Sequence, residues 1–497
     1  MQGDLSDAQV LLAVLAKKGI HVPDERQNDL YAFISGEMQS RLISQIKQNE
    51  GELMSAWILR QRIIDIDLQS WVIPNATVGK DYKAELDVKA LKIEDVRIYE
   101  ILGLKDVGLS WDAIEKKIIG VPTKTGMMEL TVKYSFTQQN DTQPVNYYSK
   151  KMHFVINPDP RTLWKNIPSD QNAPFWKEDN AKDAAALGSR NIVVSSKRGR
   201  SHQHKGTFRD DHHSFRDFGE NGWSVVAVSD GAGSASYSRE GSKIACEAVV
   251  AYFQTLSDDN EETALSRLDA VLASHDTMPA GDELVALETK AKTSLLYPAA
   301  IDAHESLKTK VQEFAASNPK LFQSENALKQ LGEFHATLIF CLFKRFKYGY
   351  VFLTFGVGDC PIAVCYADTE NAPQVELLNV LDVGEYGGGT RFITQPHIFS
   401  DDAEIPMTKR TAIKILPSFD YLFLMTDGIY DPKFEVEANL EKVERWMAFI
   451  SDLRGENEDE AVVVFDAANQ NIDEQLSIWM DFFSKGNHDD RTLAVIY

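Results

Sequence analysis

Aspartates with a glycine or a second acid beside them recur where apolar runs of this sequence end or begin. Asp230-Gly231 directly follows the run "VVAVS", and Asp427-Gly428 directly follows "YLFLMT". Other pairs of this kind are Asp210-Asp211, Gly358-Asp359 and Asp489-Asp490. Hard divalent cations such as Mg²⁺ and Mn²⁺ prefer oxygen ligands, and a strand end holds a carboxylate on a rigid scaffold. One Asp-Gly pair alone indicates only a turn, but the ordered set predicts a metal centre assembled from separate segments.

The order of these motifs resembles that of the metal-dependent protein phosphatases of type 2C, a family of serine/threonine phosphatases. The resemblance spans roughly residues 190–497, and "SDGAGSASYSREGSKIA", "TDGIYDPKF" and "DDRT" look like stretches of a bacterial subgroup. It implies hydrolysis of phosphoserine and phosphothreonine in proteins by a water nucleophile at two Mn²⁺ or Mg²⁺ ions. It also implies a four-layer α-β-β-α domain, with two β-sheets face to face and helices outside.

The resemblance assigns roles to individual residues. Asp230 would bridge both ions, Asp427 and Asp489 would complete one of them, and Asp211 would act largely through water. Asp359 would hold a third, weaker ion, or would only stabilise a turn. The metal ligands implied in this way are Asp211, Asp230, Gly231, Asp359, Asp427 and Asp489.

The sequence departs from the family pattern at two positions. Many members carry a histidine after the first Asp-Gly, proposed as general acid, and this chain has Ala232 there. The family also places a phosphate-binding arginine five residues before the first-motif aspartate, where this chain has Gly206. The nearby basic candidates for this role are Arg200, His202, His204 and Arg209. We expect Arg209 and His202 to act beside Asp211 and Asp230 in catalysis, with a solvated surface imidazole as the alternative for each histidine.

These departures keep a second function open, that of a catalytically weak module that binds a phosphoprotein or a partner kinase. A metal-dependent phosphatase acting on a small molecule is a third hypothesis. The expected partners are a phosphoprotein substrate and a kinase encoded nearby. The four cysteines stand in no C-x₅-R loop, which argues against a thiolate mechanism.

Composition excludes several other classes. The 497 residues carry 52 Lys+Arg against 74 Asp+Glu, and a net charge of −22 argues against nucleic-acid binding. No stretch approaches about 18 uninterrupted apolar residues, so no membrane span is expected. Four cysteines without CxxC spacing predict reduced thiols rather than a disulfide framework or a zinc site. With no basic segment before the first apolar run, we expect a cytoplasmic protein.

The pattern along the chain predicts an α+β protein in four segments. Apolar residues three to four apart predict helices near the N-terminus, and alternation after Trp71 predicts a small all-β sandwich. The stretches "IPNATVGKDYKAELDV" and "GLSWDAIEKKIIGVPTKTGMMELTVKYSF" resemble immunoglobulin-like modules. The expected segments are a helical part at 1–60, the sandwich at 61–157, a proline-containing linker at 158–185 and the phosphatase domain at 186–497. The glycines at 387–389 predict a substrate-gating flap or an ordinary loop.

Overall fold

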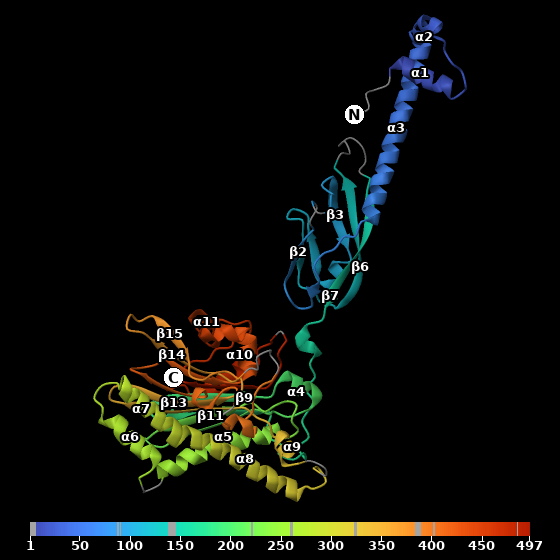
Figure 1. Cartoon of the computed structure of the whole chain (residues 1–497). Helices are drawn as coiled ribbons and strands as arrows, with labels where there is room; N and C mark the ends of the chain where they lie inside the picture. Colours follow the sequence, from blue (N-terminus) through green and yellow to red (C-terminus); the bar gives the residue numbers. More distant parts are fainter. Residues whose placement is uncertain are drawn as a thin grey trace. The chain divides into compact units, whose positions relative to one another are not determined.

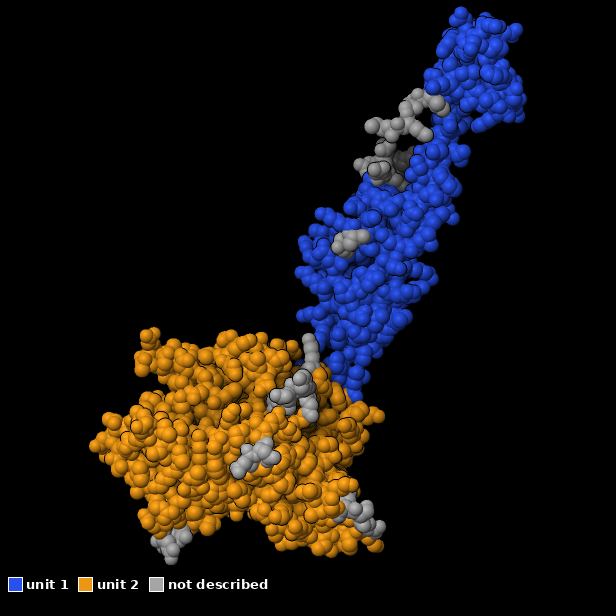
Figure 2. Space-filling view, viewed as in Figure 1, with its two compact units in different colours: residues 1–163 blue, residues 164–497 orange. Residues whose placement is uncertain are grey.

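The chain forms two compact units, residues 1–163 and residues 164–497 (Figure 1; Figure 2). The computed structural model describes residues 6–86, 89, 91–137, 146–219, 222–258, 262–322, 326–382, 389–400, 403–484 and 486–497. Apart from Gly389, the glycines of the expected flap therefore lie outside the described residues.

Unit 1 begins with three helices. They are α1 (Asp7–Ala16), α2 (Gln27–Ile34) and the long α3 (Glu37–Leu68). Ser6 and Gln9 form a capping box at the start of α1, which satisfies N–H groups that have no partner within the helix. The helices come where apolar residues recur at a spacing of three to four.

Two small sheets complete unit 1. The first has the order β1 (Ala76–Thr77), β7 (Tyr148–Asn157), β6 (Gly126–Phe136) and β3 (Val96–Leu102). The second has the order β2 (Tyr82–Glu85), β5 (Lys117–Gly120) and β4 (Leu109–Asp112). Buried and exposed side chains alternate along β7, as expected for a strand with one face on a core. Residues of both sheets share one hydrophobic cluster with Ile66 of α3, so the region has the character of a β-sandwich.

Unit 2 contains two larger sheets. The five-stranded sheet has the order β10 (His212–Asp217), β11 (Ser224–Ser229), β12 (Leu338–Phe346), β13 (Gly349–Val357) and β16 (Thr411–Leu416). The six-stranded sheet has the order β15 (Pro373–Leu377), β14 (Ile362–Ala367), β17 (Tyr421–Met425), β18 (Arg491–Ile496), β9 (Arg190–Lys197) and β8 (Asn180–Leu187). All neighbouring strands in both sheets are antiparallel.

The helices of unit 2 lie between the strands in the chain. They are α4 (Arg200–Lys205), α5 (Ser238–Asp258), α6 (Ala264–Ser274), α7 (Asp282–Ala291), α8 (Tyr297–Ser317), α9 (Ala327–Gly332), α10 (Asp427–Phe434), α11 (Val443–Leu453) and α12 (Ile472–Trp479). One hydrophobic cluster joins the two sheets to each other. A second joins the five-stranded sheet to helices that include α5 and α8, and a third joins the six-stranded sheet to α10, α11 and α12. The expected mixed α+β fold is therefore confirmed.

The stretch expected to be a linker contributes to unit 2. Strand β8 begins at Asn180 and pairs with β9 along its whole length. The ring of Trp164 lies 4.3 Å, centroid to centroid, from that of His488. Unit 2 thus begins at Trp164, upstream of residue 186.

The cysteines and the helices bear on two further expectations. All four cysteines are free and buried, as reduced core thiols would be. Within the described ranges, no helix combines the length and the apolar character that crossing a membrane requires.

Candidate active site

The aspartates singled out in the sequence come together where strands of both sheets end or begin. Asp230 follows β11, and Asp211 precedes β10, whose first residue pairs with the last residue of β11. Asp427 opens α10 directly after β17, and Asp489 precedes β18, which pairs with β17. Asp359 follows β13 of the five-stranded sheet. The strand register therefore positions these carboxylates.

Asp211 links the two sheets through its carboxylate. It is fully buried, and its Oδ2 accepts hydrogen bonds from the hydroxyls of Thr426 at 2.9 Å and Thr492 at 2.8 Å. Its Oδ1 is buried without a hydrogen-bond partner among the described residues, and so is Oδ1 of Asp359. A buried carboxylate oxygen without a donor is costly, and a cation is one way to satisfy it.

The electrostatics of the cluster lead to the same requirement. Burial raises the pKa of Asp230 well above its usual value, and the charges of Asp427, Asp211, Asp359 and Asp489 raise it further. Burial raises the pKa of each of these four neighbours as well, that of Asp211 to about 6. Five neighbouring carboxylates with raised pKa values need counter-charge in order to ionise together, and divalent cations with oxygen preference supply it. The donor set therefore fits Mn²⁺ or Mg²⁺.

Glycines allow the loops of the site to approach one another. A Cβ placed on Gly231 would lie 2.6 Å from the main-chain oxygen of Asp210, closer than real Cβ atoms come. A Cβ on Gly428 would overlap the main-chain oxygen of Asp490. The glycine of each Asp-Gly pair thus has a steric role, because it lets a neighbouring acidic segment pack directly against the strand end.

His202 belongs to a buried ion pair beside the cluster. Ligand atoms of His202, Asp210 and Asp490 lie within 4.8 Å of one another. However, His202 Nδ1 lies 2.6 Å from the carbonyl oxygen of Phe208 and 3.2 Å from Asp490 Oδ2. Because both oxygens are acceptors, Nδ1 carries a proton and donates it. Burial lowers the pKa of His202, but the nearby carboxylates outweigh it and raise the pKa to about 10. The imidazolium therefore leaves Nδ1 no lone pair for a metal.

Arg209 lies behind the carboxylates. Its side chain is buried, with Nε donating to the carbonyl of Glu178 at 3.0 Å. Its Nη1 donates to Ser196 Oγ at 2.6 Å and to the carbonyl of Asp211 at 2.9 Å. These contacts fix the main chain of Asp211.

Lys177 is a further basic residue at the site, which sequence reasoning missed. Its Nζ donates to the main-chain oxygens of Asp211 at 2.6 Å and Arg239 at 3.2 Å. Burial, and next the charge of Arg209, lower the pKa of Lys177 to about 7. Nothing in the local sequence could have revealed this role, because Lys177 lies in the stretch that composition marks as a linker.

The two departures from the family pattern have clear structural settings. Gly206 ends α4 with a φ of 75°, so it occupies a left-handed position that favours glycine. The main-chain N–H of Ala232 donates to the carbonyl of His335 at 2.9 Å. Arg200 is partly exposed, and its Nη2 donates to the carbonyl of Asp481 at 2.5 Å. Arg200 is thus less buried than Arg209 and His202, and His204 is exposed on α4.

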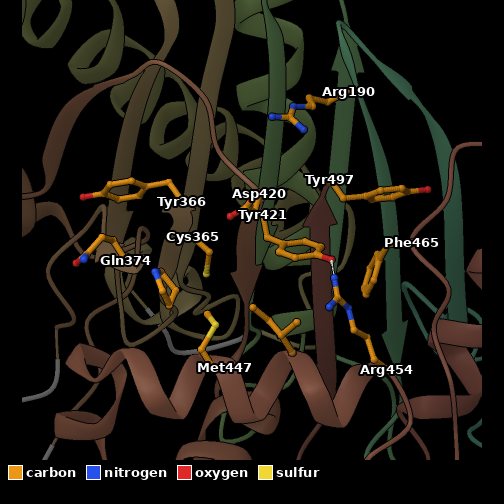
Figure 3. Close-up of a pocket in the computed structure, with 12 residues that line it drawn as sticks. Arg190, Cys365, Tyr366, Gln374, Asp420, Tyr421, Met447, Arg454, Phe465 and Tyr497 are labelled. Atoms are coloured by element: carbon orange, nitrogen blue, oxygen red, sulfur yellow. Dashed lines mark hydrogen bonds between the residues drawn. The ribbon is translucent and has the colours of Figure 1, made fainter. Parts of the chain in front are cut away.

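A separate cavity of about 370 Å³ lies at the opposite end of β17 from Asp427 (Figure 3). Tyr421, the first residue of that strand, lines it together with Arg190, Arg454 and Tyr497, and Arg454 donates to the Tyr421 hydroxyl at 2.7 Å. None of the aspartates that form the carboxylate cluster is among the residues lining this cavity. The cluster and the cavity are therefore distinct.

Comparison with known families decides the identity of unit 2. The profile described as "Protein phosphatase 2C" matches residues 198–477, which is more than half of the chain. The chain belongs to the protein phosphatase 2C family. The expected enzyme class, a protein serine/threonine phosphatase, is confirmed by this membership, and phosphoproteins are the substrates that the family acts on. No curated protein sequence matches the chain.

Solved structures similar to this phosphatase include that of the serine/threonine phosphatase Stp1 from Staphylococcus aureus. It is 14% identical, covers 63% of this chain and 96% of its own, and has a TM-score of 0.32. A serine-threonine phosphatase 2C from Toxoplasma gondii is 13% identical over 64% of this chain and 98% of its own, with a TM-score of 0.34. The catalytic domain of PstP, in complex with two manganese ions, is 14% identical over 61% of this chain and 96% of its own, with a TM-score of 0.30.

Proposed function

We propose that this protein hydrolyses phosphoserine and phosphothreonine in proteins with divalent cations held by the carboxylate cluster. The observation that carries the proposal is the convergence of five carboxylates with raised pKa values, together with unsatisfied oxygens on the two that are buried, Asp211 and Asp359. The residues that would hold the cations are Asp211, Asp230, Gly231, Asp359, Asp427 and Asp489. When bound, a pair of Mn²⁺ or Mg²⁺ ions supplies Lewis acidity and lowers the pKa of water.

The residues around the cluster have supporting tasks in this proposal. Thr426 and Thr492 orient the carboxylate of Asp211 by donating to the same oxygen. Lys177 and Arg209 hold its main-chain oxygen from the other side. Because polar groups in a fixed arrangement need no reorganisation during the reaction, this support favours catalysis. Asp230 would serve both cations, and the charges of the other four carboxylates, which all act on it, support this role.

We further propose that Arg200, rather than Arg209, contacts the phosphate of the substrate. Arg209 directs its donors to protein acceptors and is buried, so it is a positioning residue. Arg200→Ala should raise KM for a phosphopeptide with little change in kcat, because it removes a contact made already in the ground state. Arg209→Met should lower kcat and the melting temperature together. The reverse pattern in the two variants would contradict this assignment.

The main experiment replaces Asp230 with asparagine, which keeps the shape of the side chain and removes its charge. We expect Asp230→Asn to lose Mn²⁺-dependent hydrolysis of a phosphopeptide by at least about 100-fold, or about 2.7 kcal/mol in the activation free energy. Calorimetry should show the loss of high-affinity Mn²⁺ binding, whereas melting should show a folded protein. Asp420→Asn is the matched control, because Asp420 also flanks β17 but lies at the cavity end. Unchanged Mn²⁺ binding in Asp230→Asn would overturn the metal assignment.

Assays of the wild-type protein distinguish the enzyme from the alternative, a catalytically weak phosphatase-like module that binds a phosphoprotein or a partner kinase. A module of that kind would bind a phosphopeptide in the presence of Mn²⁺ without turning it over. The intact carboxylate set favours the enzyme, whereas Ala232 and Gly206 at the two departing positions are the observations behind the alternative. A kinase partner, and the division into four segments, remain proposals from the sequence.

A further inference from the structure

Among the described residues of unit 1, no segment packs against the middle of helix α3. Near its start, Ile43 is buried where α1 packs on the helix, and near its end Ile66 is buried in the sandwich core. Between them, residues 48–58 are all exposed, and the described elements that lie against α3 in Figure 1 do so near its two ends. Large apolar side chains nevertheless occupy this section, with Leu53 72% and Trp57 59% exposed.

The spacing of residues along this face is that of a coiled-coil seam. Steps of four and three alternate strictly through Ile46, Glu50, Leu53, Trp57, Arg60 and Ile64. Positions in this alternation face one side of a helix and form the contact line between two paired helices. Ile46 is 40% exposed, and Ile64 is half-buried. The seam is therefore exposed to a second helix from Ile46 to Arg60, over about 21 Å, and partly exposed at Ile64.

We propose that α3 pairs antiparallel with α3 of a second copy of the chain, about a two-fold axis that passes beside Ser55. In this register Leu53 of each copy lies opposite Trp57 of the other, and Ile46 lies opposite Ile64. The two charged positions of the seam, Glu50 and Arg60, then face each other twice. A two-fold interface uses the same patch on both copies, so each contact forms twice.

Charge complementarity is what selects this occupant and this direction. A parallel pair would place Glu50 against Glu50 and Arg60 against Arg60 in the seam, which is unfavourable. The antiparallel pair instead turns both positions into opposite-charge contacts. Within the described part of the chain, neither side chain forms an ion pair or a hydrogen bond. Both are therefore available for a contact between copies.

The isolated section also needs support. Gly51 lies in its middle, and a glycine inside a helix costs roughly 1 kcal/mol relative to alanine. Helices in water gain most of their stability from the packing of an apolar face rather than from intrinsic propensity. A second α3 would supply that packing where the described residues of the chain supply none.

The first test is the mass of the full-length protein in solution, measured by sedimentation over a wide range of concentrations. We expect a monomer–dimer equilibrium, since the seam is short. Glu50→Arg should raise the dimer dissociation constant by at least about tenfold, because two opposite-charge contacts become two like-charge contacts. Both positions are exposed, so the helical content should not change. A wild-type protein that stays monomeric at the highest concentration would overturn the proposal and leave the face to a different protein.

The second test exchanges the charges. The double variant Glu50→Arg/Arg60→Glu should recover the dimer, because each contact again joins opposite charges. An equimolar mixture of the Glu50→Arg and Arg60→Glu single variants should also recover it, as a heterodimer. Failure of both recoveries would refute the register.

The third test determines the direction of the pair. Spin labels at Ser44, an exposed position eleven residues from the proposed axis, should be separated by about 33 Å along the helices. In a parallel pair the two labels would lie at the same level. A distance that corresponds to equal levels would overturn the antiparallel arrangement, even if the protein is a dimer.

Discussion

Replacing Gly231 with alanine tests whether the close approach of two acidic segments sets the geometry of the active site. The added Cβ would lie 2.6 Å from the main-chain oxygen of Asp210 and 3.0 Å from its main-chain carbon. Real Cβ contacts to backbone rarely fall below about 3.0 Å and are comfortable beyond 3.4 Å. One of the two segments must therefore move by about 0.4 to 0.8 Å. If the first acidic segment moves, Asp210 and Asp211 are displaced. If the other segment moves, the carbonyl of Gly231 is displaced.

The expected effect follows from that displacement. A misplacement of about 1 Å costs roughly 100-fold in rate, so a shift of this size should lower kcat/KM by about tenfold, which corresponds to about 1.4 kcal/mol. Overpacking of a tight contact should also destabilise the fold by about 1 to 3 kcal/mol. Gly428→Ala should be more severe, because its Cβ would overlap the main-chain oxygen of Asp490.

The assay is hydrolysis of a small aryl phosphate and of a phosphopeptide across a Mn²⁺ titration, with thermal melting as the check on folding. The matched control is Gly233→Ala, since a Cβ on Gly233 would meet only His202 Nε2, at 3.8 Å. The control should behave like the wild type. If Gly231→Ala keeps kcat/KM within twofold of the wild type at saturating Mn²⁺, the close approach at Gly231 does not set the geometry of the active site.

Two further predictions concern the rest of the chain. A fragment of residues 164–497 should hydrolyse the small aryl phosphate at the rate of the full chain. A fragment of residues 186–497 lacks Lys177 and most of β8, so it should have a lower melting temperature and a lower kcat. Equal activity of the two fragments would contradict the role given to Lys177. In unit 1, Arg62→Met should lower the free energy of unfolding by about 1 kcal/mol, measured as faster hydrogen exchange in α3. The effect is modest because the ion pair that it removes, with two hydrogen bonds of 2.6 and 3.0 Å from Arg62 to Asp95, is partly exposed. The hydrogen bond with Arg62 lowers the pKa of Asp95, so the stability that the ion pair contributes is present above the usual carboxyl pKa and is lost as the pH falls through the lowered pKa of Asp95. A stability difference between variant and wild type that does not change with pH would contradict this.

The fold could be predicted where the sequence repeats at a clear period. The apolar run around Tyr350–Thr354 became β13, which is buried on both faces, and the alternation around Met128–Phe136 became β6. Strand β8 escaped detection because its sequence "NAKDAAAL" is rich in alanine and most of its side chains are exposed. Alanine has little preference for strands, and the hydrogen bonds to β9 form this strand despite its sequence.

The carboxylates of the site could be predicted from the sequence, but the residues that form hydrogen bonds with them could not. Asp230 and Asp427 could be singled out because each follows a strand and precedes a glycine, which is a local pattern. Thr426 and Thr492 carry no such pattern, since they lie 215 and 281 positions after Asp211 in the sequence and their hydroxyls reach it only in the folded protein. Contacts of this kind depend on topology, so a single sequence does not reveal them.

The buried cysteines allow the unfolding of the phosphatase unit to be followed by thiol alkylation. Cys246, Cys341, Cys360 and Cys365 all lie in unit 2, and burial raises the pKa of every one of their thiols. The thiolate is the nucleophile that attacks an alkylating reagent, so these buried thiols do not react while the core is closed. Each opening of the core would be recorded as an irreversible mass increase. Pulsed alkylation followed by mass spectrometry would thus time the opening of unit 2 separately from unit 1, which contains no cysteine.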